Sequence, residues 1–198
     1  MKAVLFKYGA DPKSPNLYDS KSDHCDLTDP DFVTNGQPVW SICGPYVRKN
    51  LEQGDVLFFL PQKSRLLKAG RAPDYICTGV LVVQDIIREG GRDLKDSRLS
   101  EKYRRQYVHS YNLHIKGSKG ERGDQKRAPR TAMIRSHNII LGDPRRSRWL
   151  EEPWPKVRPI YRSLGFPGKN LGFQRIPFVK EESKVRKLYR KVTGHDLS

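Results

Sequence analysis

The sequence predicts a single α+β domain, in which short helices surround a small, curved, mostly antiparallel sheet or barrel. Three observations favour this class. Apolar, β-rich runs of strand length recur along the chain, separated by breaks that contain glycine or proline. A helical pattern is clear at the C-terminal end. The 198 residues are enough for one domain with a real core, so we treat 1–198 as one unit.

The strands follow from runs of apolar and β-branched residues. The run DVLFFLP lies between Gly54 and Pro61, a pattern typical of a central buried strand. Gly79, inside a second long run, indicates a bulge or a close backbone approach. Segments 2–8, 38–43, 55–61, 74–87 and 136–142 are expected to be strands.

Helices are expected between and after these strands. Pro45 favours the first turn of a short helix over 45–51, and Gly54 follows its end. The segment 99–111 fits another helix, and 143–155 fits a turn followed by a short helix. In the last helix, capped by Gly194, apolar residues recur at helical spacing: Val185, Leu188, Tyr189 and Val192.

One basic segment interrupts this pattern. Residues 116–130 carry six cations against two acids, which is typical of a flexible loop inserted in the domain. The whole chain is also basic, with a net charge of +16, and only 36% of it is hydrophobic. Such an excess favours a polyanionic partner, above all nucleic acid, over a charge that merely keeps the protein dispersed.

Several classes of protein are disfavoured. No apolar run reaches the roughly 18–20 residues of a membrane span, and the N-terminal segment fits a strand better than a signal peptide. Cys25, Cys43 and Cys77 are odd in number and form no C-x-x-C pair. Cys43 and Cys77 lie in apolar runs and are expected to be buried. We expect a cytoplasmic protein with no membrane association, no metal and no cofactor.

The sequence is poor in catalytic motifs. It contains no phosphate-binding G-x-x-x-x-G-K-S/T, no G-x-G-x-x-G and no G-x-S-x-G. His109 and His114 straddle an expected strand, and their odd separation of five places them on opposite faces, so a metal pair is disfavoured. Asp29, Asp31 and Asp143 are the only general acids or bases that an enzyme reading can use, and turn formation is the favoured role of the first two.

Basic residues occur beside aromatic residues in three places. EKYRRQY, RRSRW and RKLYRK each combine rings with cations, as phosphate contact with base stacking requires. In the C-terminal helix the aromatic ring is instead expected to pack inward. Arg145, Arg146 and Arg148 crowd a turn, where each faces solvent or an anion.

Residues 38–87 resemble a known arrangement. A short strand, a basic helix, GDVLFF, a polar loop and TGVLVV follow one another. Together with CGPYVR (43–48), DPDF (29–32) and LGDP (141–144), this order resembles the PUA-like superfamily, which includes EVE, YTH and ASCH domains. The likeness is greatest to its nucleotide-modification-associated domains. The second and third aromatic residues of a YTH cage have no counterpart, so recognition of methyladenine is not implied.

This resemblance implies a base pocket at the end of a small barrel. Trp40 would stack on a flipped base, and the residues around it would read the base edge; the alternative is that Trp40 belongs to the core. The pocket residues would be Trp40, Ser41, Cys43, Tyr46 and Asp31. The phosphate-binding residues would be Arg48, Lys49, Lys63, Arg65, Lys68, Arg145, Arg146 and Arg148.

The sequence therefore predicts a non-catalytic nucleic-acid-binding domain that recognises a modified base. DNA is favoured over RNA, in the context of DNA modification or restriction. An RNA-binding protein of the same fold, or an enzyme that modifies or excises bases, remains an alternative. No protein partner can be named.

Overall fold

The computed structural model describes nine stretches of the chain: residues 1–8, 30–32, 36–41, 45–61, 76–88, 96–105, 138–151, 153–165 and 178–197. The predictions for the 116–130 loop, for residues 106–111 of an expected helix, and for His109 and His114 lie outside these residues.

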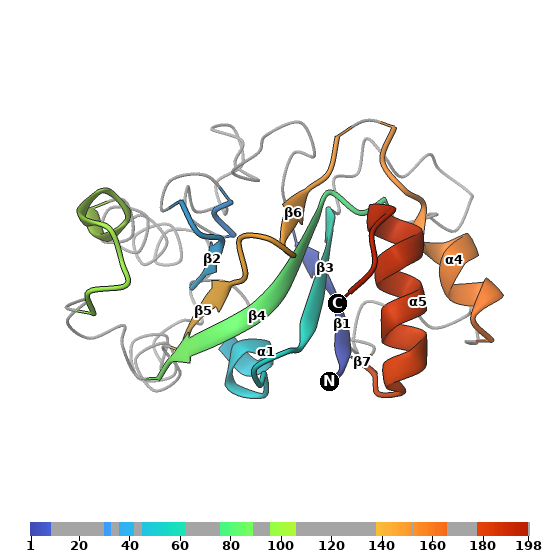
Figure 1. The fold of residues 1–198 in the computed structure, drawn as a ribbon, viewed down its shortest axis with the longest axis horizontal. Coiled ribbons are helices and arrows are strands. Elements are labelled where there is room, and N and C mark those ends of the chain that lie inside the picture. The colour runs from blue at the N-terminus through green and yellow to red at the C-terminus, as the bar shows by residue number, and fades with distance from the viewer. Residues whose placement is uncertain are drawn as a thin grey trace, which may run out of the picture.

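The described strands form one mixed sheet in the order β2-β5-β4-β3-β1-β7, with β6 beside β4 (Figure 1). The β1–β3 pair is parallel and the other pairs are antiparallel. In the described part of the chain this strand order is open and does not close into a barrel. The structure is therefore compatible with the expected α+β class, in the form of an open sheet. The strands are β1 (Ala3–Tyr8), β2 (Val39–Trp40), β3 (Val56–Pro61), β4 (Gly79–Ile87), β5 (Ile139–Gly142), β6 (Arg148–Trp149) and β7 (Phe178–Val179).

Four of the five expected strands are confirmed, although β4 begins only at Gly79 within the expected 74–87, and β2 is shorter than 38–43. Gly79 begins β4, and a Cβ atom there would lie 3.0 Å from the Phe32 ring, so the expected close approach is real. The bulge in β4 lies further along, between Val83 and Asp85.

The central strands are buried on both faces, because successive side chains of a strand point to opposite sides. On one face, the core packs against α5 (Glu182–Thr193) and α4 (Val157–Ser163). The other face of the sheet is covered by Val47 of α1 (Pro45–Lys49) and by Leu51, which follows this helix. A helical turn at 101–105 places Tyr103 over a third cluster beside β5. Figure 1 shows α4 and α5 together at one side and α1 below β4.

The C-terminal helix matches its sequence pattern. Its four expected apolar residues are all buried, and Gly194 ends the helix with φ of 75°, a left-handed conformation that glycine adopts without strain. The expected inward packing of Tyr189 is confirmed. Its hydroxyl donates to the Arg146 carbonyl at 2.6 Å, which joins α5 to the turn before β6.

The short helix expected within 143–155 is wrong. Asp143 accepts hydrogen bonds from the backbone N–H groups of Arg145 and Arg146, which closes a turn. The chain then pairs with β4 as β6, and the next helix, α4, begins only at Val157. No helix in the described part of the chain is both long and apolar enough to cross a membrane.

Candidate nucleic-acid interface

The sheet topology gathers four chain segments at one edge. The start of β1 lies beside the start of the parallel strand β3 and beside the end of the antiparallel strand β7. The end of β4 extends past the start of β3. We call this the lower sheet edge, and it lies at the bottom of Figure 1, below the point where α1 leads into β3.

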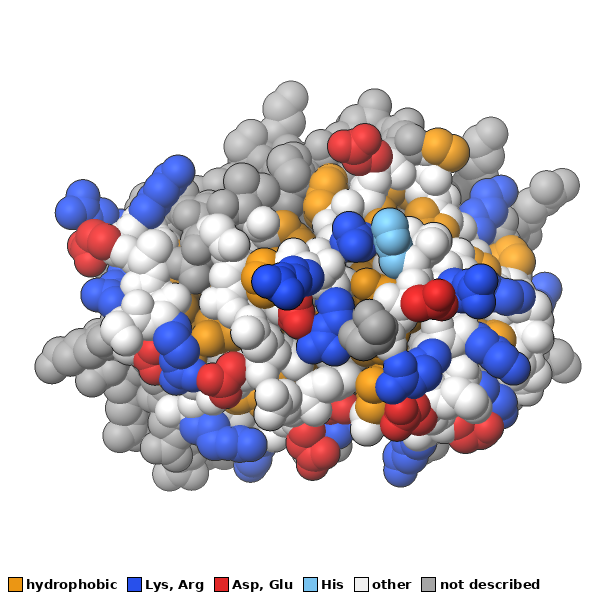
Figure 2. Space-filling view, in the orientation of Figure 1, with side chains coloured by type: hydrophobic (Ala, Val, Ile, Leu, Met, Phe, Trp, Pro, Cys, Tyr) orange, Lys and Arg blue, Asp and Glu red, His pale blue; other side chains and the backbone are white. Residues whose placement is uncertain are grey.

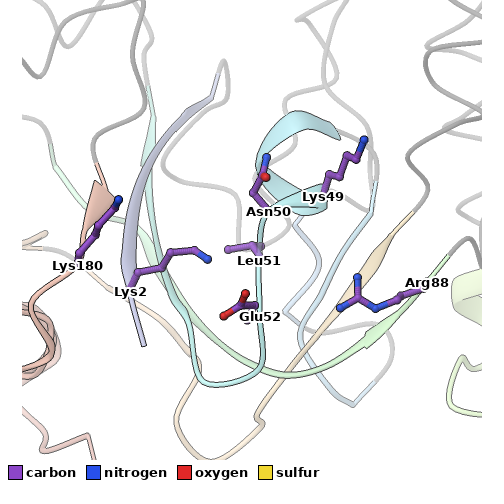
Figure 3. Close-up of a pocket in the computed structure, with 7 residues that line it drawn as sticks. All are labelled: Lys2, Lys49, Asn50, Leu51, Glu52, Arg88 and Lys180. Atoms are coloured by element: carbon purple, nitrogen blue, oxygen red, sulfur yellow. The ribbon is translucent and has the colours of Figure 1, made fainter.

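A cavity of about 480 Å³ opens at the lower sheet edge (Figure 3). Four of its lining residues are cations, contributed by four separate segments, and one is an acid. Figure 3 shows Lys2 and Arg88 reaching in from opposite sides, with Glu52 between them. The lining residues are Lys2, Lys49, Asn50, Leu51, Glu52, Arg88 and Lys180. We call this the cationic cavity.

Asp55 fixes the wall of the cationic cavity. Its side chain is buried, with 2% exposure. Its two oxygens accept hydrogen bonds from the backbone N–H groups of Lys2 and Glu52, each at 2.8 Å. The Lys2 ammonium also lies 3.1 Å from Asp55 Oδ2. Lys2 is therefore compensated by a buried carboxylate.

The other three cations of the cavity are not compensated in this way. Lys49, Arg88 and Lys180 are exposed, and none forms an ion pair with another described residue. Like charges brought together by the fold raise the local positive potential, which attracts anions. The cavity is thus suited to bind a phosphate group.

Elsewhere on the surface, cations are mixed with acids. Figure 2 shows Lys and Arg side chains over much of one face, with Asp and Glu side chains among them. On α5, Arg186 pairs with Glu182 at 2.8 Å and Lys184 pairs with Glu181 at 2.6 Å. Pairing of this kind neutralises much of the α5 surface.

The arginine turn is only partly available to an anion. Arg146 Nε lies 2.7 Å from Asp143 Oδ2, whereas Arg145 is exposed. Partial burial opposes ionisation of Asp143, but the hydrogen bonds from Arg146 and Arg145 outweigh it and lower the pKa of this carboxyl. A carboxylate held ionised is a poor general acid, so the role that an enzyme reading leaves to Asp143 is that of a general base.

Trp40 has no exposed surface, so it is not a preformed stacking face. Its ring centroid lies 4.7 Å from that of Phe6 and 5.6 Å from that of Phe59. Trp40 therefore takes the core position that the sequence left open as the alternative. In the sequence, Trp40 lies among residues that favour a β-strand, and a tryptophan on the buried face of a sheet packs against its neighbours. The sequence therefore also allowed a core position.

The prediction that Arg48 contacts phosphate at the surface is wrong in this structure. Arg48 is 1% exposed, its Nη1 donates to the Asn138 carbonyl, and its guanidinium carbon lies 6.0 Å from the Trp40 ring centroid. Ser41 is likewise buried and accepts a hydrogen bond from the Tyr103 hydroxyl. The side chains of Arg48 and Ser41 therefore make hydrogen bonds inside the protein.

The remaining expected site residues are less informative. Asp31 is buried and pairs through its backbone with Val39. Lys49 is exposed and lines the cationic cavity. Five other predictions lie outside the described residues: Asp29, Cys43, Lys63, Arg65 and Lys68. A sixth, Tyr46, lies in α1, but its side chain is outside the described part.

Cys77 is a buried thiol in the core, as expected from its sequence context. It donates a hydrogen bond to the Gly79 carbonyl at 3.3 Å. Burial raises the pKa of the Cys77 thiol to about 12, despite the opposing backbone hydrogen bonds. Among the described residues, no three His, Cys, Asp or Glu side chains gather in a way that could hold a metal ion.

Comparison with known proteins gives no match to any family model, characterised protein or solved structure.

Proposed function

We propose that this chain is a nucleic-acid-binding domain that holds phosphates in the cationic cavity and recognises a base. The observation that carries the proposal is that Lys49, Arg88 and Lys180, none of them ion-paired with a described residue, line one cavity at one edge of the sheet. Phosphate contacts of this kind supply most of the affinity for nucleic acid, independent of sequence.

Two further points support the proposal. The whole chain has a net charge of +16, so the cavity lies in a positive field that steers a polyanion toward it. The order of motifs in 38–87 resembles PUA-like domains of the nucleotide-modification-associated type. That resemblance favours DNA over RNA, and a modified base as the recognised group.

Binding to a fluorescent 20-base-pair DNA duplex, measured by anisotropy at several salt concentrations, tests the proposal. Affinity should fall steeply as salt rises, because bound cations displace condensed counterions. In the triple variant Lys49→Gln, Arg88→Gln, Lys180→Gln, affinity should drop. The log–log slope should become shallower by roughly 0.9 for each phosphate contact removed.

A matched triple variant controls for net charge. Lys102, Arg162 and Lys187 are also exposed, and they lie on three elements away from the cationic cavity. Their replacement by Gln removes the same charge, and it should leave most of the affinity and slope intact. Equal losses in both triple variants would show diffuse charge attraction and would refute a phosphate site in the cavity.

A panel of RNA and DNA oligonucleotides with plain and modified bases tests the finer part of the proposal. Tight, modification-dependent binding without product supports base recognition. Turnover of the base would instead establish an enzyme.

A further inference from the structure

The cations of the cationic cavity line one hollow instead of following a track along the surface. Lys2 precedes β1, Lys49 ends α1, Arg88 follows β4 and Lys180 follows β7. Each strand of a DNA duplex carries one charge per about 3.4 Å of helix axis, so a surface for internal phosphates needs cations spread along a track. Cations gathered around one hollow suit a single, more highly charged group.

The net charge of the cationic cavity matches such a group. Its four cations face two carboxylates, Glu52 in the lining and the buried Asp55 beside Lys2, which leaves two positive charges. An internal phosphodiester carries a single negative charge. A phosphomonoester, like that of phosphoserine, carries about −1.5 to −2 at pH 7, because its second pKa is about 6. The monoester therefore compensates the charge of the cavity more completely than the diester does.

The hydrogen-bond donors of the cavity also fit a phosphomonoester. Lys49, Arg88 and Lys180 are exposed and form no ion pair with any described residue, so their N–H groups are available. A phosphomonoester has three acceptor oxygens outside its ester bond, whereas an internal phosphodiester has two. Hydrogen bonds from ammonium and guanidinium groups to phosphate are among the strongest in proteins. Three cationic side chains from three segments are thus enough for the three oxygens.

We propose that the cationic cavity binds the terminal phosphate of a nucleic-acid strand. This inference rests on the proposed function, because it names the kind of phosphate that the same cavity holds. The net charge of +16 on the whole chain favours a strand over a free nucleotide, since the cations outside the cavity attract the remaining phosphates. The strand end enters the cavity, and the rest of the strand leaves across the surface.

Single-stranded DNA 12-mers of one sequence, each with a fluorophore on a central thymine, provide the test. They carry a 5′-phosphate, a 3′-phosphate or hydroxyl groups at both ends. A 14-mer with hydroxyl ends has about the same total charge as a phosphorylated 12-mer, so it controls for charge alone. Anisotropy should show that one phosphorylated 12-mer binds at least about tenfold more tightly than the 14-mer. This factor is the lower end for one added hydrogen bond to a charged group.

Methylation of the preferred terminal phosphate converts it to a diester at the same position. One negative charge and one acceptor oxygen are lost, so most of the preference for the phosphorylated strand should disappear. An unchanged affinity after methylation would show that the cavity does not distinguish a monoester from a diester, and would overturn the inference.

Two triple variants locate the preference on the protein. The triple Gln variant of the cationic cavity should bind the phosphorylated 12-mer and the 14-mer with similar affinity. The matched triple variant at Lys102, Arg162 and Lys187 removes the same charge elsewhere and should keep the preference. Thermal melting of each variant establishes that it is folded.

Each outcome decides one of the two proposals. Salt-dependent binding with equal affinity for the phosphorylated 12-mers and the 14-mer would overturn the terminal-phosphate site and leave nucleic-acid binding intact. A preference that survives in the triple Gln variant of the cationic cavity would overturn the site too, because the strand end would then bind elsewhere. If thymidine 5′-monophosphate displaces the strand at a concentration near the dissociation constant of the strand, the ligand is a free nucleotide and the assignment to a strand end is wrong. No binding of any strand would overturn the proposed function itself.

Discussion

Replacing Trp40 by Ala should destabilise the protein strongly and change its affinity per folded molecule little. The side chain has no exposed surface and contacts the rings of Phe6 and Phe59. Truncation of a buried Phe or Trp costs about 3–5 kcal/mol, and each lost aromatic pair adds to the cost of area alone. Arg48 would also lose the ring beneath its guanidinium and face a void.

Such a loss is large beside the total stability of a typical domain, which is about 5–15 kcal/mol. For a chain of this length, about 2–4 °C of Tm is lost per kcal/mol, so a drop of roughly 6–20 °C is expected. Urea unfolding followed by circular dichroism gives the free energy of unfolding. Anisotropy, corrected for the folded fraction, gives the affinity.

Trp149→Ala is the matched control for this experiment. Trp149 is only half-buried at the margin of the same cluster, so its truncation should cost clearly less. If Trp40→Ala loses less than about 1 kcal/mol of stability while affinity per folded molecule falls, Trp40 stacks on a ligand and its assignment to the core is wrong.

Three other predictions follow from the core and from the titrating groups. Gly142→Ala should cost about 1–3 kcal/mol in a urea titration, because its Cβ would lie 2.9 Å from Leu81 Cγ; a neutral result would mean that the sheet shifts to make room. In a variant with Cys25→Ser and Cys43→Ser, Cys77 should react with iodoacetamide at pH 8 only after unfolding, since burial raises the pKa of its thiol to about 12. Asp96, whose pKa the Arg98 hydrogen bond lowers to about 2, should show that pKa in an NMR titration. A lowered carboxyl pKa contributes stability at neutral pH that is lost as the pH falls from about 4 toward 2, and Asp96→Asn should reduce that loss.

The fold was largely predictable because its signals are local. Apolar runs bounded by Gly54 and Pro61 identify a buried strand, and helical spacing before Gly194 identifies α5. The error at 143–155 is also local in origin. The cations and aromatics of this segment fit a short helix, but Asp143 closes a turn and β4 offers a pairing edge to Arg148 and Trp149.

The site was much less predictable, because its residues meet only through topology. Lys2 precedes β1, Arg88 follows β4 and Lys180 follows β7, each as a single cation beside a strand. The sequence did contain a signal, which is a cation next to the end of each strand. When several strand ends lie at the same edge of a sheet, the residues beside them are brought together. Reading this signal requires the strand order, which no single segment contains.

The base pocket was misplaced for a related reason. Trp40 and Arg48 form a pattern of ring and cation that fits an exposed binding surface. The five-residue helix α1 instead directs Arg48 toward the Asn138 carbonyl just before β5. That acceptor lies 90 residues away along the chain, so the internal use of Arg48 leaves no local trace.

The position of β1 between β3 and β7 has a consequence for how the chain folds during synthesis. This strand is synthesised before both of its partners, which are separated from it by about 50 and about 175 residues. Until β7 and α5 emerge, β1 lacks its β7 partner and the face that carries Ala3 and Leu5 lacks the cover of α5. Pairings this distant form slowly, because closing a long loop costs entropy before any contact compensates it. We therefore expect β1 to remain open to chaperones and to aggregation until β7 and α5 have been synthesised.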